Sequence, residues 1–275
     1  MPVFDAEALE FWEENGYVVV PEAVPLENCR AAEQAVWDFL EMDRDDPDSW
    51  YPDPPRKSIM VEIYQHQALW DNRQYPRVHQ AFTEIWNTEK LWVSFDRASM
   101  NPPERPDWQF TGPYLHWDMS LDDMPVRLKV QGVLYLADTP GNQGAFTCIP
   151  GFHRKLESWL KDLPADANPR EVVREYQAEA VPVAGKAGDL VIWHSALPHG
   201  SSPNSAERPR MAQYITMSPA PTNGNSGSRE HRITGWRERL TGLGKEGKEK
   251  EHYHGQTAEL TPLGEKLLGL EPWSA

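Results

Sequence analysis

The chain has 275 residues, of which 39% are hydrophobic and 25% are charged, as is typical of a globular protein with a sizeable core. Its formal net charge of −15 argues against binding to nucleic acid or to an anionic membrane surface, because both need clustered lysine and arginine. The two cysteines, Cys29 and Cys148, lie far apart without metal-site spacing, so we expect reduced thiols and no disulfide framework. Because the sequence contains no signal-peptide pattern and no apolar run of about 20 residues, we expect a cytoplasmic protein.

The N-terminal third begins with a helix, a strand and a second helix. Asp5 can cap a helix that ends at Asn15, with Gly16 in the stop position. Residues 17–20 form the first strand, and residues 26–41 carry apolar side chains at helical spacing, as in a helix that covers a sheet. Downstream we expect an acidic, proline-rich loop over 43–56, a helix over 76–86 and a strand over 91–100. We interpret the loop as a solvated linker, with a substrate lid as the alternative.

A His-x-Asp motif lies near the middle of the chain. In a β-strand, residues i and i+2 share one face, so His116 and Asp118 would present an imidazole nitrogen and a carboxylate oxygen side by side, with Trp117 on the other face. One neutral and one anionic ligand from a rigid strand form the beginning of a site with two histidines and one carboxylate for non-haem iron. Because the motif alone also fits a surface strand or a turn, the metal site requires a second histidine from elsewhere in the chain.

The next hundred residues supply strands and helices around this motif. Residues 126–136 alternate apolar and polar side chains, as in a strand exposed on one side, and Gln131 of this strand is a candidate cavity residue. Residues 138–144 form a turn. Helices over 156–159 and 170–178, with an insertion between them, and a strand over 181–183 follow.

Two histidines could complete the metal site. A turn at 188–189 leads into an apolar strand over 190–193, and His194 ends that strand. His199 follows in a loop rich in glycine, serine, proline and asparagine, where a ligand is held by the scaffold and remains accessible. We therefore predict His199 as the third ligand and interpret His194 as a wall or core histidine.

An arginine stands at the start of a plausible strand over 211–217. The planar fork of Arg210 can bind a carboxylate with two hydrogen bonds and keeps its charge when it is buried. We predict that Arg208, two residues earlier, is a solvated residue at the rim.

The composition changes from Pro219 onward. Residues 222–227 and 244–251 are interpreted as loops, with a short amphipathic helix near 232–240. His252 and His254 have the spacing of a metal pair, but no carboxylate-bearing strand accompanies them, so we interpret them as part of a solvated tail. This pair, His153 and His194 are predicted to be dispensable for metal binding.

Several of these pieces occur together, in order, in one known family. The chain resembles the phytanoyl-CoA dioxygenase-like Fe(II)/2-oxoglutarate oxygenases from about residue 8 to about residue 217. The matching segments are Phe11–Val20, His116–Asp118, Asn142–Lys155, His199–Asn204 and Arg210.

The resemblance implies both a fold and a reaction. The fold would be mainly β with flanking α-helices, a cupin-like jelly-roll or double-stranded β-helix, in one domain over 1–275 with 219–275 as a less certain extension; sequence pattern alone leaves a generic β-sandwich open. His116, Asp118 and His199 would bind Fe(II), and Arg210 with Ser201 would bind the distal carboxylate of 2-oxoglutarate. Reaction with O₂ would yield succinate and CO₂ while a small organic substrate is oxidised.

Two positions refine this expectation. Related halogenases have a small residue where this chain has Asp118, so the resemblance implies a hydroxylase. Phe152 stands where many relatives have serine, which alters the inherited substrate contacts. Our candidate substrate-facing residues are Trp117, Phe152, Trp193 and Gln131.

Two other functions remain open. A cupin-type metal enzyme independent of 2-oxoglutarate would keep the three metal ligands without needing Arg210. A barrel protein that binds a small molecule without turnover is the non-enzymatic alternative. Consumption of 2-oxoglutarate distinguishes the first from an oxygenase, and iron content distinguishes the second.

Overall fold

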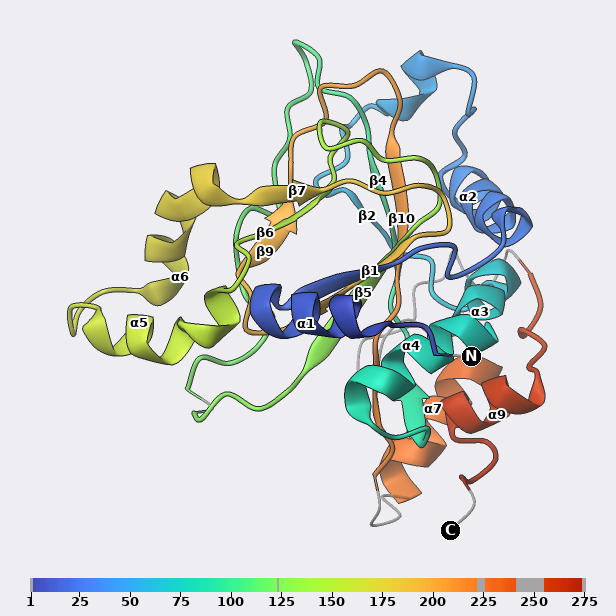
Figure 1. Ribbon diagram of the computed structural model, residues 1–275. Helices are drawn as coiled ribbons and strands as arrows, with labels where there is room; N and C mark the ends of the chain where they lie inside the picture. The colour runs from blue at the N-terminus through green and yellow to red at the C-terminus, as the bar shows by residue number, and fades with distance from the viewer. Residues whose placement is uncertain (1, 123, 222–225, 241–254, 274–275) are drawn as a thin grey trace.

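The computed structural model describes residues 2–122, 124–221, 226–240 and 255–273. Antiparallel sheets lie at the centre of this part of the chain (Figure 1). The largest has six strands, in the order β1 (Tyr17–Val20), β8 (Leu190–His194), β5 (Val130–Tyr135), β10 (Arg210–Tyr214), β4 (Ala98–Asn101) and β2 (Met60–Val61). A three-stranded sheet has the order β7 (Val181–Val183), β6 (Phe146–Cys148) and β9 (His199–Ser201), and β11 (Met217–Pro219) pairs with β3 (Leu91–Val93).

The six-stranded and three-stranded sheets face each other across an inner apolar core. Val191 and Trp193 of β8 point into this core, where they meet Phe146 of the smaller sheet. Leu190 and Ile192 of the same strand belong to a second core on the opposite face. Because side chains alternate along a strand, β8 contributes to both cores. Two facing antiparallel sheets are the jelly-roll arrangement that the sequence resemblance predicted.

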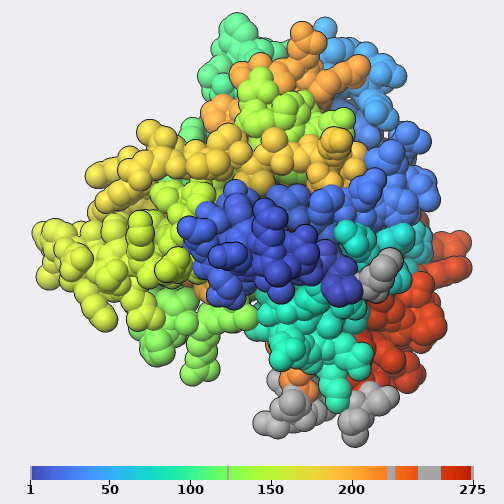
Figure 2. Space-filling model, in the orientation of Figure 1, coloured from blue at the N-terminus to red at the C-terminus, as the bar shows by residue number. Residues whose placement is uncertain are grey.

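Helices cover the outer face of the large sheet. Buried side chains of four helices meet the sheet there: α2 (Leu26–Leu40), α3 (Gln67–Arg73), α4 (Pro76–Trp86) and α9 (Pro262–Leu268). The N-terminal helix α1 (Ala6–Asn15) lies across the front of the sheets in Figure 1, and Figure 2 shows this segment covering the middle of that face. About 34% of the described residues are helical and 19% are in strands or bridges.

A helical segment between β6 and β7 projects from the side of the sheets, at the left of Figures 1 and 2. It contains η2 (Phe152–Arg154), α5 (Leu156–Asp162), α6 (Pro169–Val172) and η3 (Val173–Glu179). Both of the predicted helical stretches, 156–159 and 170–178, lie within these bounds. A shorter 3-10 turn, η1 (Pro47–Trp50), interrupts the predicted loop over 43–56.

The first helix begins and ends as predicted. The side chain of Asp5 accepts a hydrogen bond from the Ala8 backbone N–H at 2.8 Å. Gly16 ends the helix with a φ of 75°, a conformation that glycine adopts without strain. The predictions of β1, α2 and α4 are also confirmed, with bounds that agree within one residue.

Several strand predictions are wrong. The predicted strand over 211–217 is divided into β10, which ends at Tyr214, and β11, which begins at Met217 and pairs with β3 in another sheet. The stretch 91–100 is divided into β3 and β4, which belong to different sheets. β5 is buried on both faces, because it is a central strand of the large sheet and the helical layer covers its outer face. The His-x-Asp motif lies on no strand, since only an isolated bridge joins His116 to His199. His199 itself begins β9 and is not in a loop.

Trp117 is buried in the inner core directly after the bridge at His116. Its indole is buried against the rings of Phe152 and Trp159, at centroid distances of 6.0 and 5.8 Å. The indole N–H also donates to the carbonyl oxygen of Ala196 at 2.9 Å. Among the described residues, β9 is bridged to this segment at His116 and forms no bridge with Asp118.

The described part of the C-terminal segment packs beside α3 and α4. Arg232 of α7 (Ser226–Arg237) is buried, and its guanidinium donates to the carbonyl oxygen of Val93 at 2.6 Å and to that of Leu268 at 2.9 Å. The Trp273 indole N–H donates to the carbonyl oxygen of Leu91 at 3.0 Å. The predicted loop over 244–251, most of the predicted loop over 222–227, and His252 with His254 lie outside the described residues. None of the described helices is long and apolar enough to span a membrane.

Candidate active site

The two histidines of the candidate metal site are held together by their backbones. The backbone N–H of His116 donates to the carbonyl oxygen of His199 at 2.9 Å, and the backbone N–H of His199 donates to the carbonyl oxygen of His116 at 3.0 Å. Gly200 permits this approach, because a Cβ atom there would lie 2.7 Å from the carbonyl oxygen of Pro113. The two imidazole centroids are 4.6 Å apart as a result.

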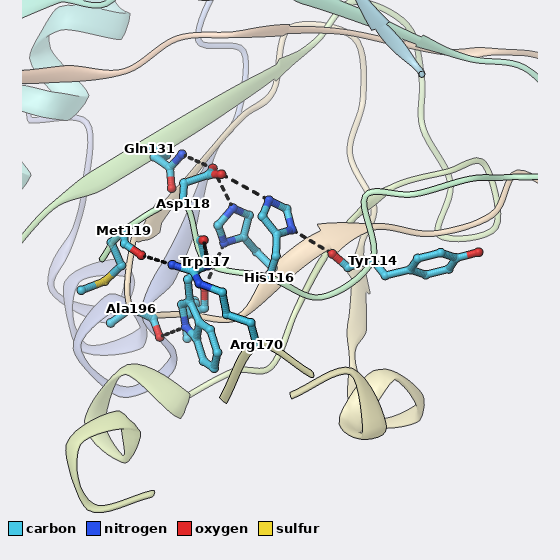
Figure 3. A network of polar contacts seen from close by, with 10 residues as sticks. Tyr114, His116, Trp117, Asp118, Met119, Gln131, Arg170 and Ala196 are labelled. Atoms are coloured by element: carbon cyan, nitrogen blue, oxygen red, sulfur yellow. Dashed lines mark hydrogen bonds and ion pairs between the residues drawn. The ribbon is translucent and has the colours of Figure 1, made fainter. Parts of the chain in front are cut away.

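Both imidazoles are oriented by the same local contact. Nδ1 of His116 lies 2.8 Å from the carbonyl oxygen of Tyr114, and Nδ1 of His199 lies 2.9 Å from that of Leu197. A carbonyl oxygen only accepts, so each Nδ1 carries a proton, and Nε2 presents a lone pair when the imidazole is neutral. Tyr114 supplies only its backbone here, and Figure 3 shows its ring directed away from the site.

Asp118 completes a cluster of three ligands. Its two carboxylate oxygens lie 3.4 Å from Nε2 of His116 and 3.3 Å from Nε2 of His199. The three ligand atoms all lie within 4.8 Å of one another. Gln131 of β5 donates to the carboxylate from Nε2 at 2.7 Å, so the carboxylate is oriented from a second element (Figure 3).

Asp118 and His116 shift each other's pKa values. Hydrogen bonding to His116 and then to His199 holds the pKa of Asp118 well below its usual range. Burial alone would lower the pKa of His116, but the hydrogen bond and charge of Asp118 outweigh it and raise that pKa. When both Nε2 atoms are unprotonated, the lone pairs of three ligand atoms face one another. A cation bound between these atoms would remove the repulsion between the lone pairs.

The cluster opens into a cavity of about 220 Å³. Its lining includes the three candidate ligands, the predicted residues Arg210, Ser201, Gln131 and Trp193, and further apolar side chains such as Val133 and Phe146. A larger cavity of about 530 Å³, lined in part by Asp38 and His66, shares no residue with the cluster.

Arg210 is a buried cation in this cavity. It begins β10, is 1% exposed, and donates to Ser201 Oγ at 2.8 Å, to Ser99 Oγ at 2.7 Å and to the Gly144 carbonyl oxygen at 3.0 Å. No carboxylate of the described residues lies within 4.0 Å of it, although a buried charge is costly without an opposite charge. Arg208, by contrast, is exposed, as predicted.

The four candidate substrate-facing residues divide into two pairs. Trp193 and Gln131 line the cavity, and the indole N–H of Trp193 is buried without a hydrogen-bond partner among the described atoms. Trp117 and Phe152 are absent from that lining and pack against each other instead. Their placement favours a structural role.

His153 and His194 lie apart from the cluster. The rings of His153 and His194 are 5.3 Å apart, and neither residue lines the cavity. Burial, and next the proximity of His153, lowers the pKa of His194 to about 4. Dispensability of both residues for metal binding stays a prediction.

Sequence reasoning missed several groups on the cavity wall. Asp96, Arg97 and Tyr214 line the cavity, and Arg97 pairs with Glu62 at 2.7 Å. Burial raises the pKa of Asp96. Alternation in β10 could have indicated Tyr214, which lies four residues after Arg210 and on the same face; no sequence signal marks Asp96 and Arg97, because they lie in the break between β3 and β4.

Cys148 is a neutral neighbour of the cluster. It pairs in register with His199 across β6 and β9 and is fully buried. Burial raises the pKa of its thiol to about 12. The thiol is therefore protonated at neutral pH, and Cys148 is not among the residues that line the cavity.

Known proteins resemble the chain in both sequence and structure. A protein of Dictyostelium discoideum named for phytanoyl-CoA dioxygenase is 26% identical over 281 residues, covering 81% of this chain and 78% of that protein. A solved structure of a hypothetical protein from Escherichia coli has a TM-score of 0.67 at 19% identity, covering 97% of this chain and 82% of that one. The epimerase SnoN, solved with Fe3+, alpha ketoglutarate and nogalamycin RO, has a TM-score of 0.57 at 18% identity, covering 93% and 94%.

At such identities the structural likenesses bear on the fold, and they confirm the predicted jelly-roll with flanking helices. The family is decided by sequence. The family model described as Phytanoyl-CoA dioxygenase matches residues 12–212, which is most of the chain and includes all three candidate metal ligands. The chain therefore belongs to the phytanoyl-CoA dioxygenase family.

Proposed function

We propose that this chain is an Fe(II)/2-oxoglutarate-dependent oxygenase that acts on a small organic molecule. In this proposal His116, Asp118 and His199 bind the iron, and Arg210 with Ser201 binds the distal carboxylate of 2-oxoglutarate. One observation carries it: three converging lone-pair donors share a 220 Å³ cavity with a buried arginine that has no carboxylate partner among the described residues. SnoN, a protein of the same fold, is known with both Fe3+ and alpha ketoglutarate.

The donor set fits iron. Two neutral imidazoles and one carboxylate are the ligands typical of non-haem Fe(II) oxygenases, which leave the other metal positions open. Each imidazole is oriented through Nδ1 by a carbonyl oxygen, and Gln131 orients Asp118. Such supporting contacts keep the ligand atoms directed at one point.

The arginine fits the co-substrate. Of the five N–H groups of Arg210, those that donate to Ser201, Ser99 and Gly144 fix the plane of the guanidinium. A carboxylate would supply the missing negative charge, and the Ser201 hydroxyl would lie beside it. An enzyme independent of 2-oxoglutarate would have no use for a cation buried in this cavity.

The residues of the chain would divide the work of the reaction. Bound iron and 2-oxoglutarate supply the oxidising chemistry, in which O₂ and 2-oxoglutarate become succinate and CO₂ while substrate is oxidised. His116, Asp118 and His199 hold the metal, and Arg210 orients the co-substrate. Trp193, Phe146 and Val133 limit access of water to the reacting atoms.

Hydroxylation is the reaction outcome that we propose. Asp118 occupies the position that halogenases leave small, so a third protein ligand takes the place of a halide. SnoN, an epimerase, has the same fold, so the outcome depends on where substrate lies and not on the scaffold.

Anaerobic binding tests the proposal directly. Purified protein is titrated with Fe(II) and then with 2-oxoglutarate, and the visible absorption band of the chelate is recorded. We expect one iron per chain, appearance of the band, and succinate release when O₂ is admitted. Iron binding without the band and without succinate would favour the metal enzyme that does not use 2-oxoglutarate, and absence of iron binding would favour a non-catalytic barrel.

A further inference from the structure

The loop that carries Asp118 has little backbone support of its own. Up to His116 the segment is held by the bridge to His199 and by the Pro113 carbonyl oxygen, which accepts from the Ser201 N–H at 2.9 Å. Beyond His116, none of the described residues before β5 lies in a strand. Within the described residues, the carbonyl oxygens of Trp117 and Met119, which flank Asp118, receive hydrogen bonds from one side chain only, that of Arg170.

Arg170 binds both of these carbonyl oxygens with one guanidinium. Nη1 donates to the carbonyl of Trp117 at 2.5 Å, and Nη2 donates to that of Met119 at 2.6 Å. Figure 3 shows the side chain reaching the backbone on either side of Asp118. A planar fork with two parallel donors fixes the relative position of two acceptors, which a flexible ammonium cannot do.

A second residue of the same segment holds the other end of the motif. Oε1 of Gln177 in η3 accepts a hydrogen bond from the backbone N–H of Leu115 at 3.0 Å, and Leu115 is fully buried. The His-x-Asp motif is thus held from both ends by residues of the helical segment that projects between β6 and β7.

The projecting segment is itself anchored. The side chain of Asn168 accepts from the Arg170 N–H at 3.0 Å and caps α6, which fixes the start of the helix that carries Arg170. Val173 is fully buried in the inner core, and Trp159 packs against Trp117. The segment can therefore transmit a fixed position to the loop.

We infer that Arg170, assisted by Gln177, is a positioning residue that sets the place of the Asp118 carboxylate in the metal site; the metal part of this inference rests on the proposed function. In this inference the helical segment supports the His-x-Asp motif, as a neighbouring strand would have done in the predicted arrangement. Because much of Arg170 is solvent-exposed, replacing it does not open the core.

The test compares matched variants of two residues, with a control on the same segment. Arg170→Met removes both donors, and Arg170→Lys restores one charge without the fork. Gln177→Leu removes the acceptor for the Leu115 N–H, whereas Gln177→Glu keeps an acceptor oxygen. Arg174→Met is the control, because Arg174 is an exposed arginine of η3 and has no hydrogen bond or ion pair with the described residues of the loop.

Two measurements separate positioning from stability. Amide hydrogen exchange of residues 114–121 is followed in metal-free protein, and the apparent Fe(II) affinity is measured anaerobically against a competing chelator. We expect faster exchange confined to 114–121 in Arg170→Met and Gln177→Leu, and a loss of Fe(II) affinity of about 10- to 100-fold, as for other residues that support metal ligands. Arg170→Lys and Gln177→Glu should recover part of the affinity, and Arg174→Met should match the wild type.

The inference is overturned if Arg170→Met leaves exchange of 114–121 unchanged, or if its exchange rises equally throughout the protein. It is also overturned if Fe(II) affinity survives while the loop exchanges faster. Should the wild-type protein bind no Fe(II), the proposed function fails, and the exchange data still decide whether Arg170 holds the loop.

Discussion

His116 and His199 commit one ring nitrogen each to the carbonyl oxygen two residues earlier in the chain. The same local contact therefore sets both rings, and the backbone bridge between the two residues brings the rings together. The consequence is a proposed metal site whose two imidazoles do not depend on distant side chains for their orientation. The orientation of Asp118 does depend on distant side chains. Gln131 donates to its carboxylate, and the Arg170 side chain binds the backbone beside it.

The first prediction concerns the metal ligands. His116→Ala or His199→Ala should lower Fe(II) affinity by more than about 100-fold, because each removes a ligand atom and not only its support. Metal analysis after anaerobic loading provides the measurement, and His194→Ala is the matched control. Iron lost from the His194 variant but retained by the His199 variant would exchange the two assignments.

The second prediction concerns the co-substrate. Arg210→Ala should weaken binding of 2-oxoglutarate by about 2–5 kcal/mol, because the carboxylate loses a buried charged partner. Arg210→Lys should also bind weakly, since an ammonium cannot reproduce the fork. Arg208→Ala should cost less than about 0.5 kcal/mol, as is usual for an exposed side chain.

Anaerobic titration of the Fe(II) protein with 2-oxoglutarate distinguishes these variants. An unchanged affinity in Arg210→Ala would remove the proposed co-substrate site. A loss in Arg208→Ala alone would instead show that the register of the site is displaced by two residues.

At the scale of elements, the short strand β9 contributes several parts of the candidate site. Its three residues are His199, Gly200 and Ser201. One strand therefore supplies a proposed metal ligand, the close approach to residue 113 and the hydroxyl beside Arg210. Pairing with β6 on the other side fixes its direction. Changes in this strand should therefore affect metal and co-substrate binding together.

Gly200→Ala tests this third prediction. Its Cβ would lie 2.7 Å from the carbonyl oxygen of Pro113 and 2.9 Å from backbone atoms of Tyr114, so one of the two segments must move. We expect a destabilisation of about 1–3 kcal/mol and weaker binding of both Fe(II) and 2-oxoglutarate.

Urea unfolding and the two anaerobic titrations measure these effects. Gly141→Ala is the control, because a Cβ there meets Pro182 at 3.4 Å, an ordinary contact. Normal stability and normal ligand binding in Gly200→Ala would mean that the approach of the two segments is not needed for the site.

The elements differ in how far the sequence predicts them. α1 and α2 were predictable because caps and helical spacing are local signals, and β8 because its apolar run is bounded by turn residues. The spacing of the His-x-Asp segment predicts a strand, but the segment forms only a bridge at His116, and Trp117 is buried in the inner core. That burial depends on Trp159, more than 40 residues away, and no local pattern reports it.

The same distinction holds for the site. The three ligands and Arg210 could be proposed because their residue types and order match a family. Arg170 could not, because it acts on backbone carbonyls, whose partners do not depend on the residue type in the loop.

At the scale of the whole molecule, the C-terminal helices are packed against the rest of the fold. Arg232 of α7 binds carbonyl oxygens of β3 and of α9, and its guanidinium lies over the rings of Trp92 and Phe95. These contacts support the proposal that residues 1–275 form one domain. α9 also contributes buried leucines to the core outside the large sheet.

The fourth prediction follows from this arrangement. Arg232→Met should destabilise the protein by about 2–4 kcal/mol, because several buried carbonyl oxygens lose a charged donor. Arg237→Met, at an exposed position of the same helix, should change stability by less than about 0.5 kcal/mol. The free energy of unfolding in urea provides the comparison. Equal values for the two variants would contradict a stabilising role of the hydrogen bonds of Arg232.

The two cysteines lie in different layers of the fold. Cys29 belongs to the core between the helices and the large sheet, and Cys148 belongs to the inner core between the two sheets. Both thiols are buried, and burial raises the pKa of each to about 12. A thiol-specific reagent can thus modify either residue only when its layer opens. The rate of labelling at Cys29, measured by mass analysis, would report how fast the helical layer separates from the large sheet. The rate at Cys148 would report how fast the two sheets separate from each other. The native chain therefore already contains one probe for each of these two openings.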